Sequence, residues 1–134
     1  MQTNANAYAM IRKTNLSFDE TVETLRTALT TQGFGVLSEI DVSATLKKKL
    51  DAEYPRTLIL GACNPSLALR ALTAIPDISV FLPCNLVVRM DGEQVEVAVI
   101  NPLVMAEMMH HSEIDAVAQD ADARLRNVLD ALNP

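Results

Sequence analysis

The fold is decided by residues 85–100, which read NLVVRMDGEQVEVAVI. Two runs rich in β-branched and apolar residues flank the pair Asp91-Gly92 in this stretch. Asp-Gly suits the two left-handed positions of a type I′ turn, so the pattern is typical of a β-hairpin. The sequence therefore predicts two antiparallel strands, Asn85–Met90 and Glu93–Ile100, joined at Asp91-Gly92.

A two-residue turn at this pair also predicts the strand register, with Val88 opposite Val95 and Cys84 opposite Val99. Side chains alternate between the two faces of a sheet. One face is then apolar and suits a core; it carries Cys84, Leu86, Val88, Val95, Val97 and Val99. The other face is mixed and suits water or a second subunit; it carries Asn85, Val87, Arg89, Gln94, Glu96 and Ala98.

Outward from the hairpin, turn and cap signals separate the remaining elements. Ser17 and Glu20 form the capping-box pattern that opens a helix, and Gly33 stands where a left-handed C-terminal cap is expected. Asn64-Pro65 and Asn101-Pro102 each pair an N-cap residue with a proline suited to the first helical turn. The pattern predicts strands at 8–13, 34–40 and 57–62, and helices at 18–32, 42–50, 66–74, 103–109 and 112–132, the last capped by Ser112.

Together these elements predict an α+β domain of β-α-β4-α order. Its mostly antiparallel, open sheet is covered on one face by the two longer helices, with short helical inserts between strands. A length of 134 residues with 49% hydrophobic residues fits a single domain over residues 1–134. Residues 1–7 carry no pattern and are expected to be a flexible N-terminal segment.

The composition and net charge of the chain limit the kinds of partner that it is expected to bind. The chain has 11 Lys and Arg against 17 Asp and Glu, a net charge of -6, which works against binding to nucleic acid or an anionic membrane. No apolar run is long enough to span a bilayer and no signal peptide is visible, so we expect a cytoplasmic protein. The basic run Lys47–Lys49 is expected to be a solvated helix face.

Chemistry-bearing side chains collect at one predicted edge of the sheet. In an antiparallel meander, the end of the strand at 57–62 and both ends of the hairpin meet there, bringing together Cys63, Asn64, Cys84, Asn85 and Asn101. Two helices open at this edge, and helix N-termini favour anions and thiolates. The edge is therefore a candidate site for a small molecule or small anion, with a lowered pKa at Cys63, the best catalytic candidate.

Structural explanations exist for the same residues. Cysteine often serves as a small buried apolar residue, and Asn64 and Asn101 suit helix caps, whereas no cap explains Asn85. The cysteines are not in a C-x-x-C pattern, and no cofactor motif is present. His110 and His111 follow a methionine-rich segment that suits a soft metal, but its spacing is more typical of a helix core face, so no metal site is predicted.

The motifs LGACNP (Leu60–Pro65), LPCN (Leu82–Asn85) and Asn101-Pro102 resemble the domain of unknown function 302 family, in a similarity that extends from Tyr8 to about Leu132. The resemblance implies a single-domain β-α-β4-α fold, homodimers and no established activity. Family members commonly carry Asp-Pro where this chain has Asn101-Pro102.

Three functional hypotheses follow. The first is a small-ligand-binding or regulatory module that uses the Cys-Asn edge, which is favoured because no acid, base and nucleophile occur together. The second is a thiol-based redox enzyme or sensor that uses Cys63 and Cys84. The third is a structural or partner-binding homodimer without a small-molecule site.

Overall fold

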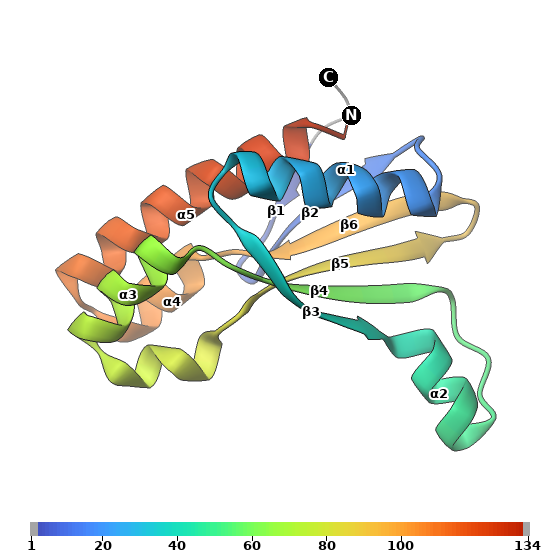
Figure 1. The fold of residues 1–134 in the computed structure, drawn as a ribbon, viewed down its shortest axis with the longest axis horizontal. Helices are drawn as coiled ribbons and strands as arrows, with labels where there is room; N and C mark the ends of the chain where they lie inside the picture. The colour runs from blue at the N-terminus through green and yellow to red at the C-terminus, as the bar shows by residue number, and fades with distance from the viewer. Residues whose placement is uncertain (1–2, 133–134) are drawn as a thin grey trace.

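The computed structural model describes residues 3–132 and contains two long helices packed on one sheet (Figure 1). In chain order the elements are β1 (Thr3–Ala5), β2 (Ala9–Thr14), α1 (Phe18–Thr31), β3 (Gly35–Asp41), α2 (Val42–Leu50), β4 (Thr57–Cys63), α3 (Pro65–Ala74), the 3-10 helix η1 (Pro76–Phe81), β5 (Cys84–Asp91), β6 (Gln94–Ile100), α4 (Leu103–Met109) and α5 (Ser112–Asp130).

The sheet has six strands in the order β1-β2-β6-β5-β4-β3, and every neighbouring pair is antiparallel. Figure 1 shows α1 and α5 side by side over one face of this sheet, while α2 projects from the end of β3. The predicted α+β class, with an open antiparallel sheet covered on one face, is confirmed. β3 forms one edge, and its pairing with β4 shifts register between Val36 and Ser38.

The hairpin register differs from the prediction by two residues. Asp91 pairs with Gln94 and Val88 pairs with Val97, so the turn residues are Gly92 and Glu93. Gly92 has a φ of 63°, a left-handed conformation that glycine adopts without steric cost, and it takes the first turn position while Asp91 stays extended. A two-residue shift preserves the alternation of faces. The predicted apolar face is therefore confirmed: Cys84, Leu86, Val88, Val95, Val97 and Val99 are all buried.

Other elements differ from the expectation at particular points. The flexible segment expected over residues 1–7 lies partly outside the described residues; within them, Thr3–Ala5 form β1 on the edge of β2. η1 was not predicted. Ser112 is the first residue of α5 rather than its cap, because the Nδ1 atom of His111 accepts the Glu113 amide hydrogen bond at 3.1 Å.

The ends of α1 follow the predicted signals. The Ser17 hydroxyl accepts a hydrogen bond from the Glu20 amide, and the Glu20 carboxylate accepts one from the Ser17 amide, each at 3.1 Å. This exchange satisfies two donors that the first helical turn leaves without partners. Gly33 has a φ of 82° after the helix, as expected for a left-handed C-terminal cap.

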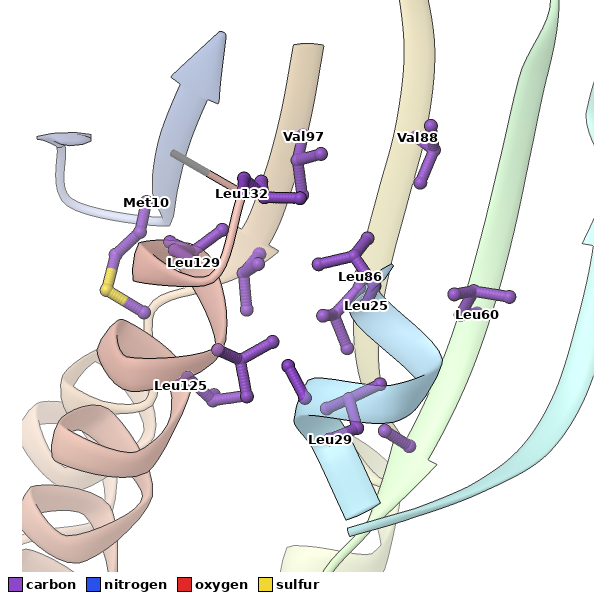
Figure 2. Close-up of a cluster of buried hydrophobic side chains, with 14 of the residues drawn as sticks. Met10, Leu25, Leu29, Leu60, Leu86, Val88, Val97, Leu125, Leu129 and Leu132 are labelled. Carbon is purple, nitrogen blue, oxygen red and sulfur yellow. The ribbon is translucent and has the colours of Figure 1, made fainter. Parts of the chain in front are cut away.

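The main core lies between the two long helices and the covered face of the sheet. Figure 2 shows leucines of α1 and α5 meeting side chains from the strands, among them Leu29, Leu125, Leu86 and Val97. A second, smaller apolar cluster lies under α3, η1 and α4 and involves Leu67, Ala71, Ile78, Met105, Ile114, Val117 and Ala121. The end of the sheet at which the sequence places Cys63, Cys84 and the asparagines, called the Cys-Asn end below, therefore packs against this second cluster.

Candidate functional site

The ends of three strands, β4, β5 and β6, lie together at the end of the sheet where the sequence predicts the candidate site. Cys63 ends β4, and the first residue of β5, Cys84, lies opposite Ala62. Asn101 follows β6 directly, and its amide donates a hydrogen bond to the Tyr8 carbonyl at 2.9 Å. The antiparallel order thus gathers the two cysteines and Asn101 at one end of the sheet.

A small cavity of about 40 Å³ lies behind this end, against the second apolar cluster. Sheet residues, α3, η1, α4 and α5 all contribute to its walls. The lining residues are Phe34, Ala62, Cys63, Asn64, Leu67, Ala68, Ala71, Ile78, Leu82, Cys84, Met105, Ile114, Val117, Ala118 and Ala121. Apart from Asn64 and the two thiols, no lining side chain carries a polar hydrogen-bonding group, so the cavity is an apolar environment.

The two cysteines are free thiols in different surroundings. Cys84 is buried, with 8% of its surface exposed, whereas Cys63 is half-buried. Burial, with a smaller electrostatic contribution from Cys63, raises the pKa of Cys84 from 9.0 to about 11. A thiol in apolar surroundings loses the solvation that its charged form needs. Cys84 is therefore protonated, and a poor nucleophile, at neutral pH.

The side chain of Asn64 links two helices by hydrogen bonds. Its Oδ1 atom accepts a hydrogen bond from the Leu67 amide at 3.2 Å and so caps α3, while its Nδ2 atom donates to the Gln32 carbonyl at 3.3 Å. The same carbonyl accepts a hydrogen bond from Nη1 of Arg124 at 2.9 Å. Asn64 thus connects the end of α1 to the start of α3, and both ends of its amide group are engaged.

The other two asparagines lie outside this arrangement. The Nδ2 atom of Asn101 donates to the Asn6 carbonyl at 3.0 Å, and its Oδ1 atom accepts from the Leu103 amide at 3.1 Å. Asn85 is exposed and lies opposite Gly61 in the neighbouring strand. It does not line the cavity. The structure therefore separates Asn85 from the buried part of the candidate site.

The methionine and histidine segment does not converge on one point. Met105 is buried in the cavity wall, whereas Met108 is 60% exposed. His110 is exposed at the left-handed end of α4, and His111 caps α5. Among residues 3–132, no group of three or more His, Cys, Asp or Glu side chains could hold a metal ion.

The sequence does not predict several residues of the cavity wall. Ile78, in η1, is 2% exposed and closes one side of the cavity with Leu82. The stretch between Pro76 and Pro83 carries no helical or strand periodicity, and the available signal was an apolar Ile78 between two prolines. On α5, which the sequence does predict as a helix, Ile114 and Val117 line this cavity.

Gly61 marks a close approach beside the site. A Cβ atom at this position would lie 2.3 Å from Oγ of Ser38 and 2.9 Å from Cγ of Pro83. Those distances are far below van der Waals contact, so β3 and the LPCN segment pack directly against the Gly61 backbone. This contact accounts for glycine in the LGACNP motif.

The uncovered face of the sheet carries an apolar row. The register places Ile40 beside Ile59, Ile59 beside Val87, Val87 beside Ala98, and Ala98 beside Ile11, and none of the five is buried. One adjacent row is charged and includes the Arg89–Glu96 ion pair, with Lys13 opposite Glu96. An apolar stripe bordered by paired charges thus crosses five strands of the open face, which we call the open-face stripe.

The fold and site define a small α+β protein with a thiol-containing apolar cavity at one end of its sheet. The family model described as Domain of unknown function DUF302 matches residues 10–132, and the chain belongs to this family. It is also similar to the crystal structure of an uncharacterized conserved DUF302 protein from Bacillus stearothermophilus. Identity is 30%, the match covers 93% of this chain and 98% of that chain, and the TM-score is 0.88.

No curated protein matches the chain. Within residues 3–132, no helix is both long and apolar enough to cross a membrane.

Proposed function

We propose that this protein is a small-ligand-binding or regulatory module whose site is the apolar cavity at the Cys-Asn end of the sheet. The observation that carries the proposal is the cavity itself, which is lined by fifteen residues; apart from Asn64 and the two cysteines, the other twelve are apolar. Binding sites are typically concave and apolar with few polar groups. Free thiols persist in a reducing compartment, so we place this function in the cytoplasm.

The wall chemistry restricts the ligand to a small guest without net charge. Both polar atoms of Asn64 are engaged within the chain, and Cys84 is a neutral thiol at neutral pH. The amides of Leu67 and Leu103, near the starts of α3 and α4, are also hydrogen-bonded to side chains of this chain. An anion would find no compensating donor in the cavity, and burying it would cost several kcal/mol or more.

The volume of the cavity limits the size of the ligand that it can bind. A volume of about 40 Å³ exceeds the roughly 10–15 Å³ that one water needs, but apolar walls do not supply the two to four partners that a buried water needs. The cavity therefore suits one or a few heavy atoms, or the apolar end of a larger ligand. The high pKa of Cys84 makes the alternative, a thiol enzyme with Cys84 as partner of Cys63, the weaker hypothesis.

Xenon is a suitable probe because it occupies small apolar cavities without hydrogen bonds. We expect saturable methyl NMR shifts at Ile78 and Ile114 in the wild-type protein under xenon pressure. Ala118→Leu, which fills the cavity, should remove them, whereas Ala116→Leu, on the exposed side of the same helix, should keep them. Equal shifts in both variants, or none in the wild type, would contradict the proposal.

Filling the cavity risks overpacking, so folding is checked by far-UV circular dichroism. Should Ala118→Leu not fold, Ile78→Ala provides the test in the opposite direction. It enlarges the cavity and is expected to admit benzene, which the wild type excludes. Failure of the enlarged cavity to bind either probe would count against a ligand site here.

A second candidate function, a partner-binding homodimer, is favoured by the open-face stripe. Five strands at about 4.8 Å spacing and six residues at about 3.3 Å span a face of roughly 24 by 20 Å. Two copies packed face to face would bury about 1,000 Å² in total, the lower limit of a specific interface. The border row contains Arg89, Glu96 and Lys13 together, so it is complementary to a second copy of itself.

Val87→Glu tests this homodimer, because it places a charge at the centre of the open-face stripe. We expect the wild-type protein to sediment as a dimer and Val87→Glu as a folded monomer. Val80→Glu is the matched control, since Val80 is 81% exposed on η1. A monomeric wild type, or a Val87→Glu protein that remains dimeric, would refute the proposed interface.

A further inference from the structure

The helix α2 is not packed into the core of its own chain. None of its residues is buried, and Figure 1 shows it extending beyond the end of β3. Val42, Leu46 and Leu50 recur at a spacing of four residues and form one apolar stripe along the helix, which we call the α2 stripe. Leu50 is 72% exposed, and Tyr54, in the loop after α2, is 55% exposed. Contiguous exposed apolar surface is typical of interaction sites.

The lysines of α2 differ in their position relative to this stripe. With a rotation of about 100° per residue, Lys49 lies beside the α2 stripe, whereas Lys48 lies on the opposite side of the helix. Lys47 forms ion pairs with Asp51 and Glu53. No ion pair within residues 3–132 involves Lys48 or Lys49. Lys49 therefore adds an uncompensated positive charge to the border of the stripe.

An open hollow at the tip of the β5–β6 hairpin has the complementary character. Its volume is about 370 Å³, and its lining includes Leu16, Asp91 and Glu93. Asp91 pairs with Lys13 at 3.1 Å, whereas Glu93 is exposed and takes part in no ion pair in the part of the chain that the structure describes. This acidic hollow thus combines negative charge with an apolar side chain.

The strand register places α2 and the hairpin tip beyond the same end of the sheet. β3 ends at Asp41, which lies opposite Leu58, and Leu58 pairs with Val88. β5 continues past Val88 to Asp91, a further distance of about 10 Å at roughly 3.3 Å per residue. α2 starts directly after Asp41, and its nine residues are about 13 Å long. Figure 1 shows both features at this end.

We propose that α2 docks in the acidic hollow of a second copy of this chain, and that the α2 of that copy docks in return. This inference rests on the homodimer proposed above, in which the uncovered faces of two sheets meet. A two-fold axis parallel to the strands, between β5 and β6, keeps the hairpin ends of both copies together. The strand order then sets β3 over the partner's β1 and β4 over the partner's β2. α2 thereby reaches the end of the partner's β2, beside the hollow.

The charges of the open face support the same axis. Arg89 and Glu96 are opposite each other on β5 and β6, so this axis brings Arg89 of one copy over the partner's Glu96. It also brings Lys49 of one copy toward the partner's Glu93. A two-fold axis across the strands would instead carry α2 to the Cys-Asn end of the partner's sheet, away from the acidic hollow.

The area of the α2 contacts accounts for a stable dimer. The open faces alone bury about 1,000 Å² in total, which is the lower limit of a specific interface. A helix of nine residues covers an area of about 13 by 10 Å, so two symmetric α2 contacts add roughly 500 Å². The total of about 1,500 Å² lies within the range of about 1,200–2,000 Å² that stable complexes bury.

Two lysines of α2 provide a matched test by sedimentation equilibrium of the full chain under reducing conditions. Lys49→Glu is expected to raise the dimer dissociation constant about tenfold, because each of two symmetric contacts changes from attraction to repulsion. Lys48→Glu makes the same change in net charge on the opposite side of α2 and should dimerise as the wild type does. Adding Glu93→Lys to Lys49→Glu should restore the affinity.

The apolar part of the contact has its own matched pair. Leu50→Ser should also weaken the dimer, whereas Leu69→Ser, at a residue that is 67% exposed on α3, should not. Since no residue of α2 is buried, these α2 variants are expected to keep the wild-type far-UV circular dichroism and melting temperature. Equal dissociation constants for Lys49→Glu and Lys48→Glu, or no rescue by Glu93→Lys, would overturn the proposal.

Carbodiimide cross-linking tests the contact directly, because it joins an amine only to a carboxylate that lies against it. Unlabelled and 15N-labelled protein are mixed before the reaction, so peptides of mixed label identify coupling between two copies. We expect Lys49 to couple to Glu93 in such peptides, and Lys48 to couple much less. Coupling of Lys49 to Glu93 only within single-label peptides would contradict docking on a second copy.

The outcomes separate this inference from the functions proposed above. If Val87→Glu is monomeric while Lys49→Glu dimerises as the wild type does, the open-face dimer stands and the docking of α2 fails. If the wild type is a monomer, both the dimer and the docking fail. Uptake of xenon by the cavity is independent of both results, because α2 contributes no residue to the cavity wall.

Discussion

Raising the pH from 9 to 11 is expected to destabilise the protein through Cys84. The folded protein holds the neutral thiol, with a pKa of about 11 against 9.0 in an ordinary environment. The stabilising contribution is therefore complete below pH 9 and is lost as the pH rises toward 11. Each unit of pKa difference corresponds to 1.36 kcal/mol, so a difference of two units makes the free energy of unfolding fall by about 2–3 kcal/mol.

Urea denaturation at neutral pH, pH 9 and pH 11, with a reducing agent present, measures this loss. Tyrosine and lysine side chains titrate in the same range, so the informative quantity is the difference between wild type and Cys84→Ala. We expect the variant to lack the additional alkaline loss, although truncation lowers its stability at neutral pH. Cys63→Ala, at the half-buried thiol, should retain most of the loss.

One result would refute the reasoning. If wild type and Cys84→Ala lose the same free energy of unfolding between pH 9 and pH 11, the Cys84 thiol is not desolvated. The cavity would then be open to water, and its apolar character would no longer follow.

Three other predictions concern the local contacts that shape the site. Gly61→Ala should lower the free energy of unfolding by about 1–3 kcal/mol in urea titrations, since its Cβ has no space, while Gly35→Ala, with nothing within 4 Å, should have little effect. Asn64→Ala should cost about 1–2 kcal/mol by calorimetry, because it removes a helix cap and the bond to α1; Asn101→Ala, which removes the bond from the Leu103 amide but no N-cap, should cost less. Ser17→Ala should cost about 1 kcal/mol and increase amide exchange in the first turn of α1; unchanged exchange there would contradict a role for the capping box.

Much of the fold was predictable because local sequence signals, such as caps and apolar runs, indicate the same structure as the burial of these residues. The capping box of α1 and the apolar run of β4 each indicate one structure, and α2 and α4 have the predicted bounds, Val42–Leu50 and Leu103–Met109. β1 was not predictable in this way. Its Thr-Asn-Ala sequence has no alternation, and the strand exists because β2 offers unpaired backbone groups at its edge. The predicted hairpin register was wrong because glycine can occupy either position of a two-residue turn. Gly92 takes the first position, so the turn is Gly92-Glu93 rather than Asp91-Gly92.

The candidate site was predictable in its location and less so in its composition. Strand order alone brings Cys63, Cys84 and Asn101 to one end of the sheet. The cavity, however, depends on side chains from α3, η1, α4 and α5, whose packing is a tertiary property. Asn85 was expected beside the cysteines, but strand alternation directs it to the uncovered face, since its neighbours Cys84 and Leu86 are buried.

The register shift in β3 has a consequence for self-association. A regular, uncharged edge strand is a template on which further chains add by backbone hydrogen bonding, as in amyloid fibrils. β3 interrupts this template between Val36 and Ser38 and carries the charged Glu39 and Asp41 beyond the interruption. At the opposite edge, β1 spans three of the described residues and is polar at Thr3 and Asn4. The sheet is therefore protected against fibrillar growth at both of its edges by features that contribute little to its core.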